Sequence, residues 1–299
     1  MFRIDTFKFC GNINYQGVDM YSSHNGNLLK TRKDNGPLIA AHRGTPGGSV
    51  IQNTTLSYTN ALLNGADLIE IDAIESTDGV FYAIHNGEEK TLLHMDGDIR
   101  KLSSKEIDTY DCYNSLQIRM EHQKLEKLAD ILPCFKDRCF INIDRSWFYW
   151  LNAIRFLSSM HMEDQIILKS PVREDLINTL EQSKSDIMYM PIINTMEEWR
   201  LVRDRNINIV ALEIIFETAD SPLVSPQFME EIHMRKLLAW GNAITLCDSR
   251  TLTARYDDNT SIRNGLDAGW GKLLSLGFDI LQTDWPSLMK QYLTRKKYQ

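Results

Sequence analysis

Residues 65–72 read Gly-Ala-Asp-Leu-Ile-Glu-Ile-Asp, an apolar strand pattern that contains two acids. Because side chains alternate along a strand, Glu70 and Asp72 leave the same face. Two buried carboxylates side by side repel each other and are costly to remove from water. A cation between them removes both penalties. The stretch therefore predicts a buried strand that carries a divalent metal site.

A regular alternation of strand and helix patterns surrounds this stretch. The expected strands are Leu38–Ala41, Leu68–Ile74, Val80–Ile84, Cys139–Ile143, Gln165–Leu168, Asp186–Ile193, Ile209–Ile215, Lys236–Ile244 and Phe278–Gln282. Asp78-Gly79 is a hairpin signal, so Val80–Ile84 joins the second unit. This leaves about eight βα units with strands rich in Ile, Leu and Val, a count that predicts an α/β fold of the (β/α)8 TIM barrel type.

The barrel pattern begins after Pro37 and is interrupted once. Residues 1–36 are polar and rich in Gly and Asn. We expect them to form an N-terminal extension packed on the barrel, in which Ile4–Phe9 and Leu28–Lys30 could be short strands. Residues 37–299 form the barrel domain. Residues 87–117 break the alternation and include a helix start that resembles a capping box, so we expect a small insertion above the barrel mouth.

Polar residues gather at the ends of the expected strands. In (β/α)8 barrels the chemistry lies at the carboxyl ends of the strands. The residues at or just past those ends are His42, Asp72, His85, Asp144 and Lys169. Their common position indicates one shared site.

Two of these residues, His42 and His85, are acid–base candidates. Unperturbed histidine titrates near neutrality, so one ring can hold a proton while the other accepts one. Cleavage of a phosphodiester needs both roles, one to activate the nucleophile and one to protonate the departing oxygen. The nucleophile is either water or a substrate hydroxyl, which would give a cyclic phosphate.

The acids and cations near these histidines fit the same chemistry. Glu70 and Asp72 offer only oxygen ligands, which suit Mg²⁺ or Ca²⁺ better than zinc. Asp144 ends another strand and is the expected third ligand, unless it caps the helix that follows. The planar guanidinium of Arg43 matches phosphate oxygens, and Lys169 adds a second positive charge for substrate binding.

Two further segments have alternative roles. Trp240 either forms an apolar wall for the alcohol group of a substrate or fills the core. Thr283-Asp284-Trp285-Pro286 closes the last strand, and its simplest role is to cap the final helix.

The bulk composition limits the class of protein. The chain has 299 residues, 43% hydrophobic, enough for one large domain. Its net charge of −7 argues against nucleic-acid binding. The five cysteines are scattered without a CxxC pair, so we expect free thiols in a reducing compartment, the cytoplasm. The N-terminus lacks a signal-peptide apolar region, and no stretch approaches the roughly 20 apolar residues of a membrane span, so we expect no membrane insertion.

The motifs together resemble the glycerophosphodiester phosphodiesterase family. They are His42-Arg43-Gly44, the Asn53-Thr54 pair, residues 65–72, Thr77-Asp78-Gly79 leading to His85, and the closing Gly277-Phe278-Asp279 with Thr283-Asp284-Trp285-Pro286. The resemblance implies a TIM barrel with a small insertion after the second strand unit. It also implies hydrolysis of a small-molecule glycerophosphodiester to an alcohol and glycerol 3-phosphate.

The same resemblance assigns roles to individual residues. His42 and His85 would be the catalytic acid–base pair, and Arg43 would bind phosphate. Glu70, Asp72 and Asp144 would bind Mg²⁺ or Ca²⁺.

The chain departs from the family pattern at three places. Asn86 stands where aspartate is common, and Ile51-Gln52 replaces a proline–glutamate pair. The family's third acidic ligand is usually a glutamate followed two residues later by lysine, whereas here Asp144 is followed by Arg145 and Ser146. Either Lys169 or Arg145 could substitute for that lysine.

These departures keep other functions open. One alternative is a sugar phosphodiesterase or a phospholipase D-like enzyme, and another is a barrel that binds a phosphorylated ligand without turning it over. Glycoside hydrolysis by Glu70 and Asp72 is a third, but carboxylates that flank a glycosidic bond normally come from different strands.

Overall fold

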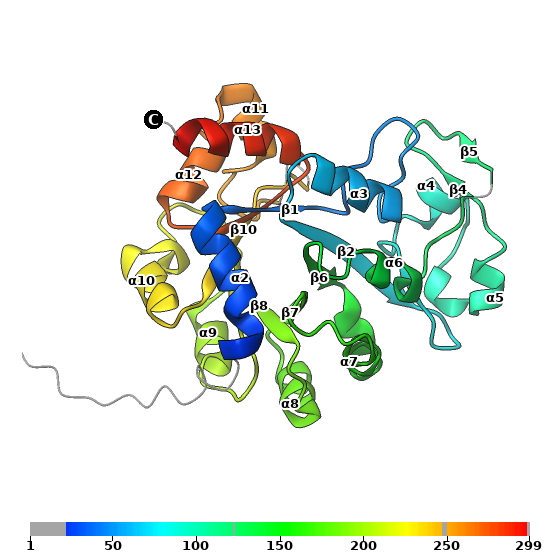
Figure 1. Ribbon diagram of the computed structural model, residues 1–299, viewed down its shortest axis with the longest axis horizontal. Coiled ribbons are helices and arrows are strands. Elements are labelled where there is room, and N and C mark those ends of the chain that lie inside the picture. Colours follow the sequence, from blue (N-terminus) through cyan, green and yellow to red (C-terminus); the bar gives the residue numbers. More distant parts are fainter. Residues whose placement is uncertain (1–21, 122, 247–249, 298–299) are drawn as a thin grey trace, which may run out of the picture.

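The computed structural model describes residues 22–121, 123–246 and 250–297, which form a parallel barrel covered by helices (Figure 1). Its strands are β1 (Leu38–Ala41), β2 (Leu68–Glu75), β6 (Phe140–Asp144), β7 (Ile166–Pro171), β8 (Met188–Ile193), β9 (Ala211–Ile214), β10 (Leu238–Asn242) and β11 (Ile280–Thr283). Each strand pairs in parallel with the next, and β1 pairs with both β2 and β11, which closes the ring. The predicted (β/α)8 barrel is confirmed.

The alternation of side chains along β2 shows how the barrel holds its polar residues. Ile69 and Ile71 belong to the core between strands and helices, whereas Leu68 belongs to the apolar cluster inside the barrel. Glu70 and Asp72 share the face of Leu68, because side chains two residues apart leave a strand on the same side. Both carboxylates therefore point into the barrel.

Helices cover the outside of the barrel. They are α3 (Thr55–Leu63), α6 (Leu128–Cys134), α7 (Trp150–Ser159), α8 (Glu174–Ser183), α9 (Met196–Val202), α10 (Pro226–Met234), α11 (Asp258–Asn264), α12 (Trp270–Ser275) and α13 (Pro286–Lys297), with 3₁₀ turns η2 (Ser146–Tyr149) and η3 (Pro222–Val224). Helix α7 is typical, since Ala153, Ile154 and Leu157 are buried at helical spacing. The sequence did not reveal α11, which is short and polar.

The hairpin after β2 and the segment that follows it also match the expectation. Ser76 N donates to Val80 O and Gly79 has φ 85°, so the chain turns into β3 (Phe81–Ala83), antiparallel to β2. The next elements are α4 (Glu89–Leu93), η1 (Ile99–Lys101), α5 (Ser104–Ile107), β4 (Cys112–Tyr113) and β5 (Arg119–Met120). They pack around a separate apolar cluster, and the capping box of Ser103 and Glu106 is present. These elements lie at one side of the barrel in Figure 1.

The N-terminal segment corrects one expectation. Leu28–Lys30 is not a strand but part of α2 (Ser22–Asn35), which crosses the barrel in Figure 1. Leu28 is fully buried among Leu38 and Leu68, the first residues of their strands, so α2 covers the amino end of the barrel. The only apolar side chains of this polar helix are the adjacent Leu28 and Leu29, so the sequence shows no helical apolar periodicity there. The other expected strand, Ile4–Phe9, lies outside the described residues.

Candidate active site

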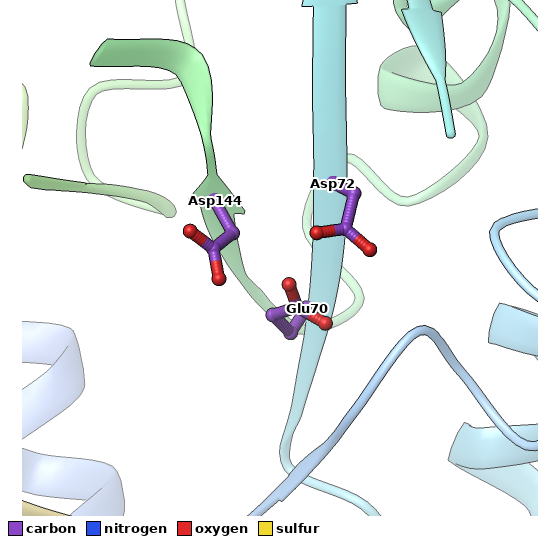
Figure 2. Close-up of side chains that lie close together, drawn as sticks. All are labelled: Glu70, Asp72 and Asp144. Atoms are coloured by element: carbon purple, nitrogen blue, oxygen red, sulfur yellow. The ribbon is translucent and has the colours of Figure 1, made fainter. Parts of the chain in front are cut away.

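Three carboxylates converge at the carboxyl end of the barrel. Asp72 and Asp144 are register partners on β2 and β6, and Glu70 lies two residues before Asp72 on the same face. One oxygen of each lies within 4.8 Å of the others (Figure 2). Pairing of two parallel strands thus brings together residues far apart in the chain. This oxygen-only group is able to hold a metal ion.

Glu70 is the most deeply buried of the three. Its Oε2 accepts a hydrogen bond of 2.8 Å from the backbone N–H of Arg43, whereas its Oε1 is buried without a partner. Burial raises the pKa of Glu70 to about 8, and the neighbouring charge of Asp72 adds to the effect. An ionised Glu70 therefore requires an additional positive charge.

This cost gives the cation-free protein a defined pH dependence. We expect wild-type stability to fall relative to Glu70→Gln as pH rises from about 4.5 to about 8. In that window the native state keeps a proton on Glu70, whose pKa is raised to about 8, while the unfolded chain has released it. The protonated form is the favoured native form, so stability is lost as pH rises. Urea unfolding in EDTA at about pH 5 and about pH 8 measures the change.

Glu217→Gln is the matched control, because Glu217 is exposed. It should follow the wild-type pH dependence. Parallel curves for wild type and Glu70→Gln would contradict the prediction.

Asp72 is oriented by Asn53, which precedes α3. Asn53 Nδ2 donates to Asp72 Oδ2 at 3.0 Å, Asn53 Oδ1 accepts from Asp72 N–H at 3.2 Å, and the hydroxyl of Tyr58 donates to the same Oδ1. Asn53 adopts a left-handed backbone with φ 56°. The cap of α3 is the next residue, Thr54, whose side chain accepts from Ser57 N–H. Asn53 instead fixes a carboxylate of the cluster.

Asp144 lies between two different donors. Its Oδ2 is 2.8 Å from Lys169 Nζ, and its Oδ1 accepts from the backbone N–H of Arg145 at 2.6 Å. Burial raises the pKa of Asp144, but the ammonium of Lys169 outweighs it and the net shift is downward. No side-chain hydrogen bond from Asp144 caps η2, so the alternative role as a helix cap is wrong.

Lys169 and Trp240 occupy the barrel interior. Lys169 is 3% exposed and lies between Asp144 and Glu213, whose Oε2 is 3.0 Å from Nζ. Burial lowers the pKa of Lys169, but the two carboxylates reverse this and raise it. Trp240 is fully buried and donates through Nε1 to Asn242 Oδ1 at 2.8 Å. Trp240 therefore fills the core, and the charge of Lys169 is committed to carboxylates; substrate contact by either residue stays a prediction.

His42 follows β1 and is held by the last strand. Its Nδ1 lies 2.8 Å from Asp284 Oδ1, because Ala41 and Thr283 are register partners and the residues after them lie side by side. Burial lowers the pKa of His42, but Asp284 and Glu70 outweigh this, so the net shift is upward. The sequence indicated Asp284 only as part of the closing motif. It did not reveal the contact with His42, because that contact depends on closure of the barrel.

His85 follows β3, and its pKa is shifted in the opposite direction from that of His42. Its Nδ1 is buried without a partner. Burial lowers the pKa of His85; the charge of Asp72 opposes this, while Arg43 and Arg145 lower it further. The residues next to the two histidines contact this carboxylate group, because Arg43 N–H donates to Glu70 Oε2 and Ile84 N–H donates to the backbone oxygen of Asp72.

The turn after β1 explains the His-Arg-Gly sequence. Arg43 has φ 56° and Gly44 has φ 79°, and a Cβ on Gly44 would lie 2.5 Å from Ser57 Oγ, so only glycine fits. This sharp turn brings Arg43 Nε to 2.9 Å from Asp72 Oδ2 and Nη1 to 3.3 Å from Glu88 Oε1. Arg43 thus borders the carboxylate group; the sequence did not reveal its partner Glu88.

Comparison with protein families identifies the class of protein. The model of the glycerophosphoryl diester phosphodiesterase family matches residues 42–220, more than half of the chain. The chain belongs to this family. It is accordingly a phosphoric diester hydrolase, and the predicted resemblance is confirmed. A second model, described as a domain of unknown function (DUF4996), matches residues 189–293.

Solved structures of the glycerophosphodiester phosphodiesterase class share the fold. The chain resembles an enzyme of this name from Parabacteroides distasonis with a TM-score of 0.69 and 15% identity, covering 94% of this chain and 92% of the other. An Agrobacterium tumefaciens enzyme gives 0.59 and 20%, covering 84% and 98%. An Oleispira antarctica phosphodiesterase in complex with the product sn-glycerol-3-phosphate gives 0.59 and 16%, covering 87% and 98%.

The remaining observations concern curated sequences and membrane-spanning helices. No curated protein sequence matches the chain significantly. Among the helices of the described residues, none combines the length and apolar character needed to cross a membrane.

Proposed function

We propose that this family member hydrolyses glycerophosphodiesters to an alcohol and glycerol 3-phosphate with a divalent cation and two histidines. The observation that carries the proposal is the convergence of three carboxylates at the end of the barrel, beside the turns after β1 and β3 that carry His42 and His85. Family membership supports the reaction class. The glycerol 3-phosphate bound as product by the Oleispira antarctica relative supports the substrate class.

The carboxylate group fits a hard divalent cation. Glu70, Asp72 and Asp144 would hold it, and the buried Glu70 Oε1 has no partner without it. Ligands that are all oxygen favour Mg²⁺ or Ca²⁺. When bound, such a cation neutralises phosphate charge and polarises the phosphorus centre.

The two histidines divide the proton transfers. One ring takes a proton from the attacking hydroxyl as the new P–O bond forms, and the other gives a proton to the alcohol oxygen as its bond to phosphorus breaks. Asp284 accepts at Nδ1 of His42, which fixes the orientation of the ring and leaves Nε2 for the reaction. Arg43 borders the same carboxylates and would bind the phosphate oxygens.

Asp284 provides a direct test of this arrangement. We expect Asp284→Asn to lower kcat/KM by about 10- to 100-fold, because His42 loses a charged partner that orients it. The pKa of His42, measured by NMR titration, should fall, since Asp284 raises it in the wild type. Asp96→Asn is the control, because Asp96 is 93% exposed. An unchanged His42 titration in Asp284→Asn would count against the role.

The reaction itself is tested by product analysis. Purified protein with Mg²⁺ or Ca²⁺ is incubated with glycerophosphocholine, glycerophosphoethanolamine and a sugar phosphodiester, and glycerol 3-phosphate release is measured enzymatically. Release from the two glycerol substrates supports the proposal. Cleavage of the sugar diester alone, or phosphate binding without turnover, would replace it with one of the alternatives given above.

The wider setting is proposed on similar grounds. We propose a cytoplasmic enzyme, because the five cysteines are scattered without a CxxC pair, which favours free thiols in a reducing compartment. We also propose that residues 37–299 form the catalytic domain, with the N-terminal extension covering one end of the barrel through Leu28.

A further inference from the structure

The cations around the carboxylate group differ in how far they are neutralised. Arg43 is paired with Asp72 and Glu88. Lys169 is likewise paired with two carboxylates, on β6 and β9. Arg145 is different, since the side chains of residues 22–121, 123–246 and 250–297 give it no carboxylate partner within ion-pair distance. Of these three cations, Arg145 alone has no carboxylate paired with it in the part of the chain that the structure describes.

Arg145 is nevertheless held in place. Its Nε donates to Asn86 Oδ1 at 2.7 Å, and its guanidinium carbon lies 5.6 Å from the centre of the Phe148 ring. Asn86 directly follows His85, so the contact fixes the guanidinium beside the loop that carries this histidine. Asn86 is neutral, and it therefore orients Arg145 without cancelling its charge. The terminal nitrogens are left to donate elsewhere.

The backbone at this position is strained. Arg145 has φ 59°, in the left-handed region that residues with a Cβ rarely adopt. The turn is stabilised by the hydrogen bond from its N–H to Asp144 Oδ1. The turn directs the side chain of Arg145 toward the loop that carries His85. Strain of this kind is concentrated at functional sites.

We propose that Arg145 binds the non-bridging oxygens of the substrate phosphate, with Asn86 as the residue that positions it. The planar fork of a guanidinium matches a phosphate and spreads over two of its oxygens. Three carboxylates and a phosphodiester leave a surplus of negative charge, and Arg145 is held where it can offset this surplus. The proposal rests on the proposed function and names the residue that takes the place of the missing lysine.

The two departures from the family pattern at this point are explained together. Asn86 stands where aspartate is common, and Arg145 and Ser146 stand where the lysine segment is expected. In the fold the two positions meet through one hydrogen bond. An aspartate at position 86 would pair with Arg145 and neutralise it, so the change to asparagine leaves the guanidinium available to an anion.

Kinetics and ligand binding test the proposal. Arg145→Gln is expected to lower kcat/KM for glycerophosphodiesters by about 100-fold or more, since one charged donor to the transition state is lost. Its affinity for glycerol 3-phosphate, measured by calorimetry in EDTA, should fall by about 10-fold or more. Arg145→Lys should recover part of both. Arg155→Gln is the matched control, because Arg155 lies exposed on α7.

Asn86→Asp gives a second test that removes no cation. It is expected to weaken catalysis and glycerol 3-phosphate binding in the same direction as Arg145→Gln, because a carboxylate then neutralises the guanidinium. Thermal unfolding of each variant checks that it is folded. Should Arg145→Gln destroy the fold, Asn86→Asp decides the question alone.

The outcomes separate this inference from the proposed function. The role of Arg145 would be overturned if Arg145→Gln and Asn86→Asp kept the wild-type kinetics and glycerol 3-phosphate affinity. An inactive His42→Asn in the same experiment would show that the proposed phosphodiesterase activity still stands. A wild type inactive on every phosphodiester, whose glycerol 3-phosphate binding still depends on Arg145, would overturn the proposed function and support Arg145.

Discussion

His42→Asn is expected to lower kcat/KM for glycerophosphodiester hydrolysis by about 1,000-fold. Nδ1 of the ring lies 2.8 Å from Asp284 Oδ1, and its acidic neighbours raise the pKa of His42, which favours the protonated form. Asparagine fills similar space but transfers no proton. Release of glycerol 3-phosphate under single-turnover conditions measures the effect on chemistry rather than on product release.

The corresponding variant of the second ring should behave in the same way. His85→Asn removes the other proton carrier, and the double variant should lose little more than either single one, because the two act in one reaction step. His161→Asn is the control, since His161 is exposed and its left-handed backbone accepts asparagine. Activity in His42→Asn within about 10-fold of wild type would rule out the two-histidine mechanism.

Removal of the cation is expected to have the second-largest effect. Chelation with EDTA should lower turnover by about 100-fold or more, and Mg²⁺ or Ca²⁺ should restore it. Added cation should also raise the thermal midpoint of the wild type, because a ligand at 100 times its Kd stabilises the native state by about 2.7 kcal/mol. The physical reason is the mutual repulsion of three carboxylates whose oxygens lie within 4.8 Å.

The variants Glu70→Gln and Asp144→Asn separate the effect of cation binding from the stability of the fold. Both should lose activity and the cation-induced rise in thermal midpoint. Glu70→Gln should in addition be more stable than the wild type in EDTA at about pH 8, since its amide relieves the repulsion around the unpartnered Oε1. Glu217→Gln should respond to cation as the wild type does. Full activity in exhaustively chelated protein would exclude a metal-dependent reaction.

Much of the fold was predictable because its signals are local. The apolar runs of the parallel strands and the turn at Asp78-Gly79 are short-range patterns, and they placed β1 and β2 closely. Helix α2 was not predictable, since its one informative residue, Leu28, gains its role only against the finished end of the barrel. The contact of Asn53 was not predictable either, since its side chain, just before α3, bonds to Asp72 on β2, which is distant in the sequence.

In the candidate site, too, residues set by local patterns were predictable and contacts between distant strands were not. Glu70 and Asp72 follow from strand period alone, and strand ends pointed to Asp144, which the register then placed beside them. The alternation of side chains along a strand does not show how deeply a side chain is buried inside the barrel. Lys169 was predicted as a substrate ligand from its strand end alone, and the sequence did not reveal its ion pair with Glu213 on β9. Such contacts depend on register between strands that the sequence leaves undefined.

The hydrogen bond between His42 and Asp284 joins the first and last strands across 242 positions of the chain. During synthesis, a nascent chain that lacks only its final strand already contains both histidines and all three cluster acids. The ring of His42 still lacks its hydrogen bond to Asp284. The growing polypeptide therefore completes the proposed reaction centre only when the ring of strands closes, and shorter translation products lack the contact that orients His42.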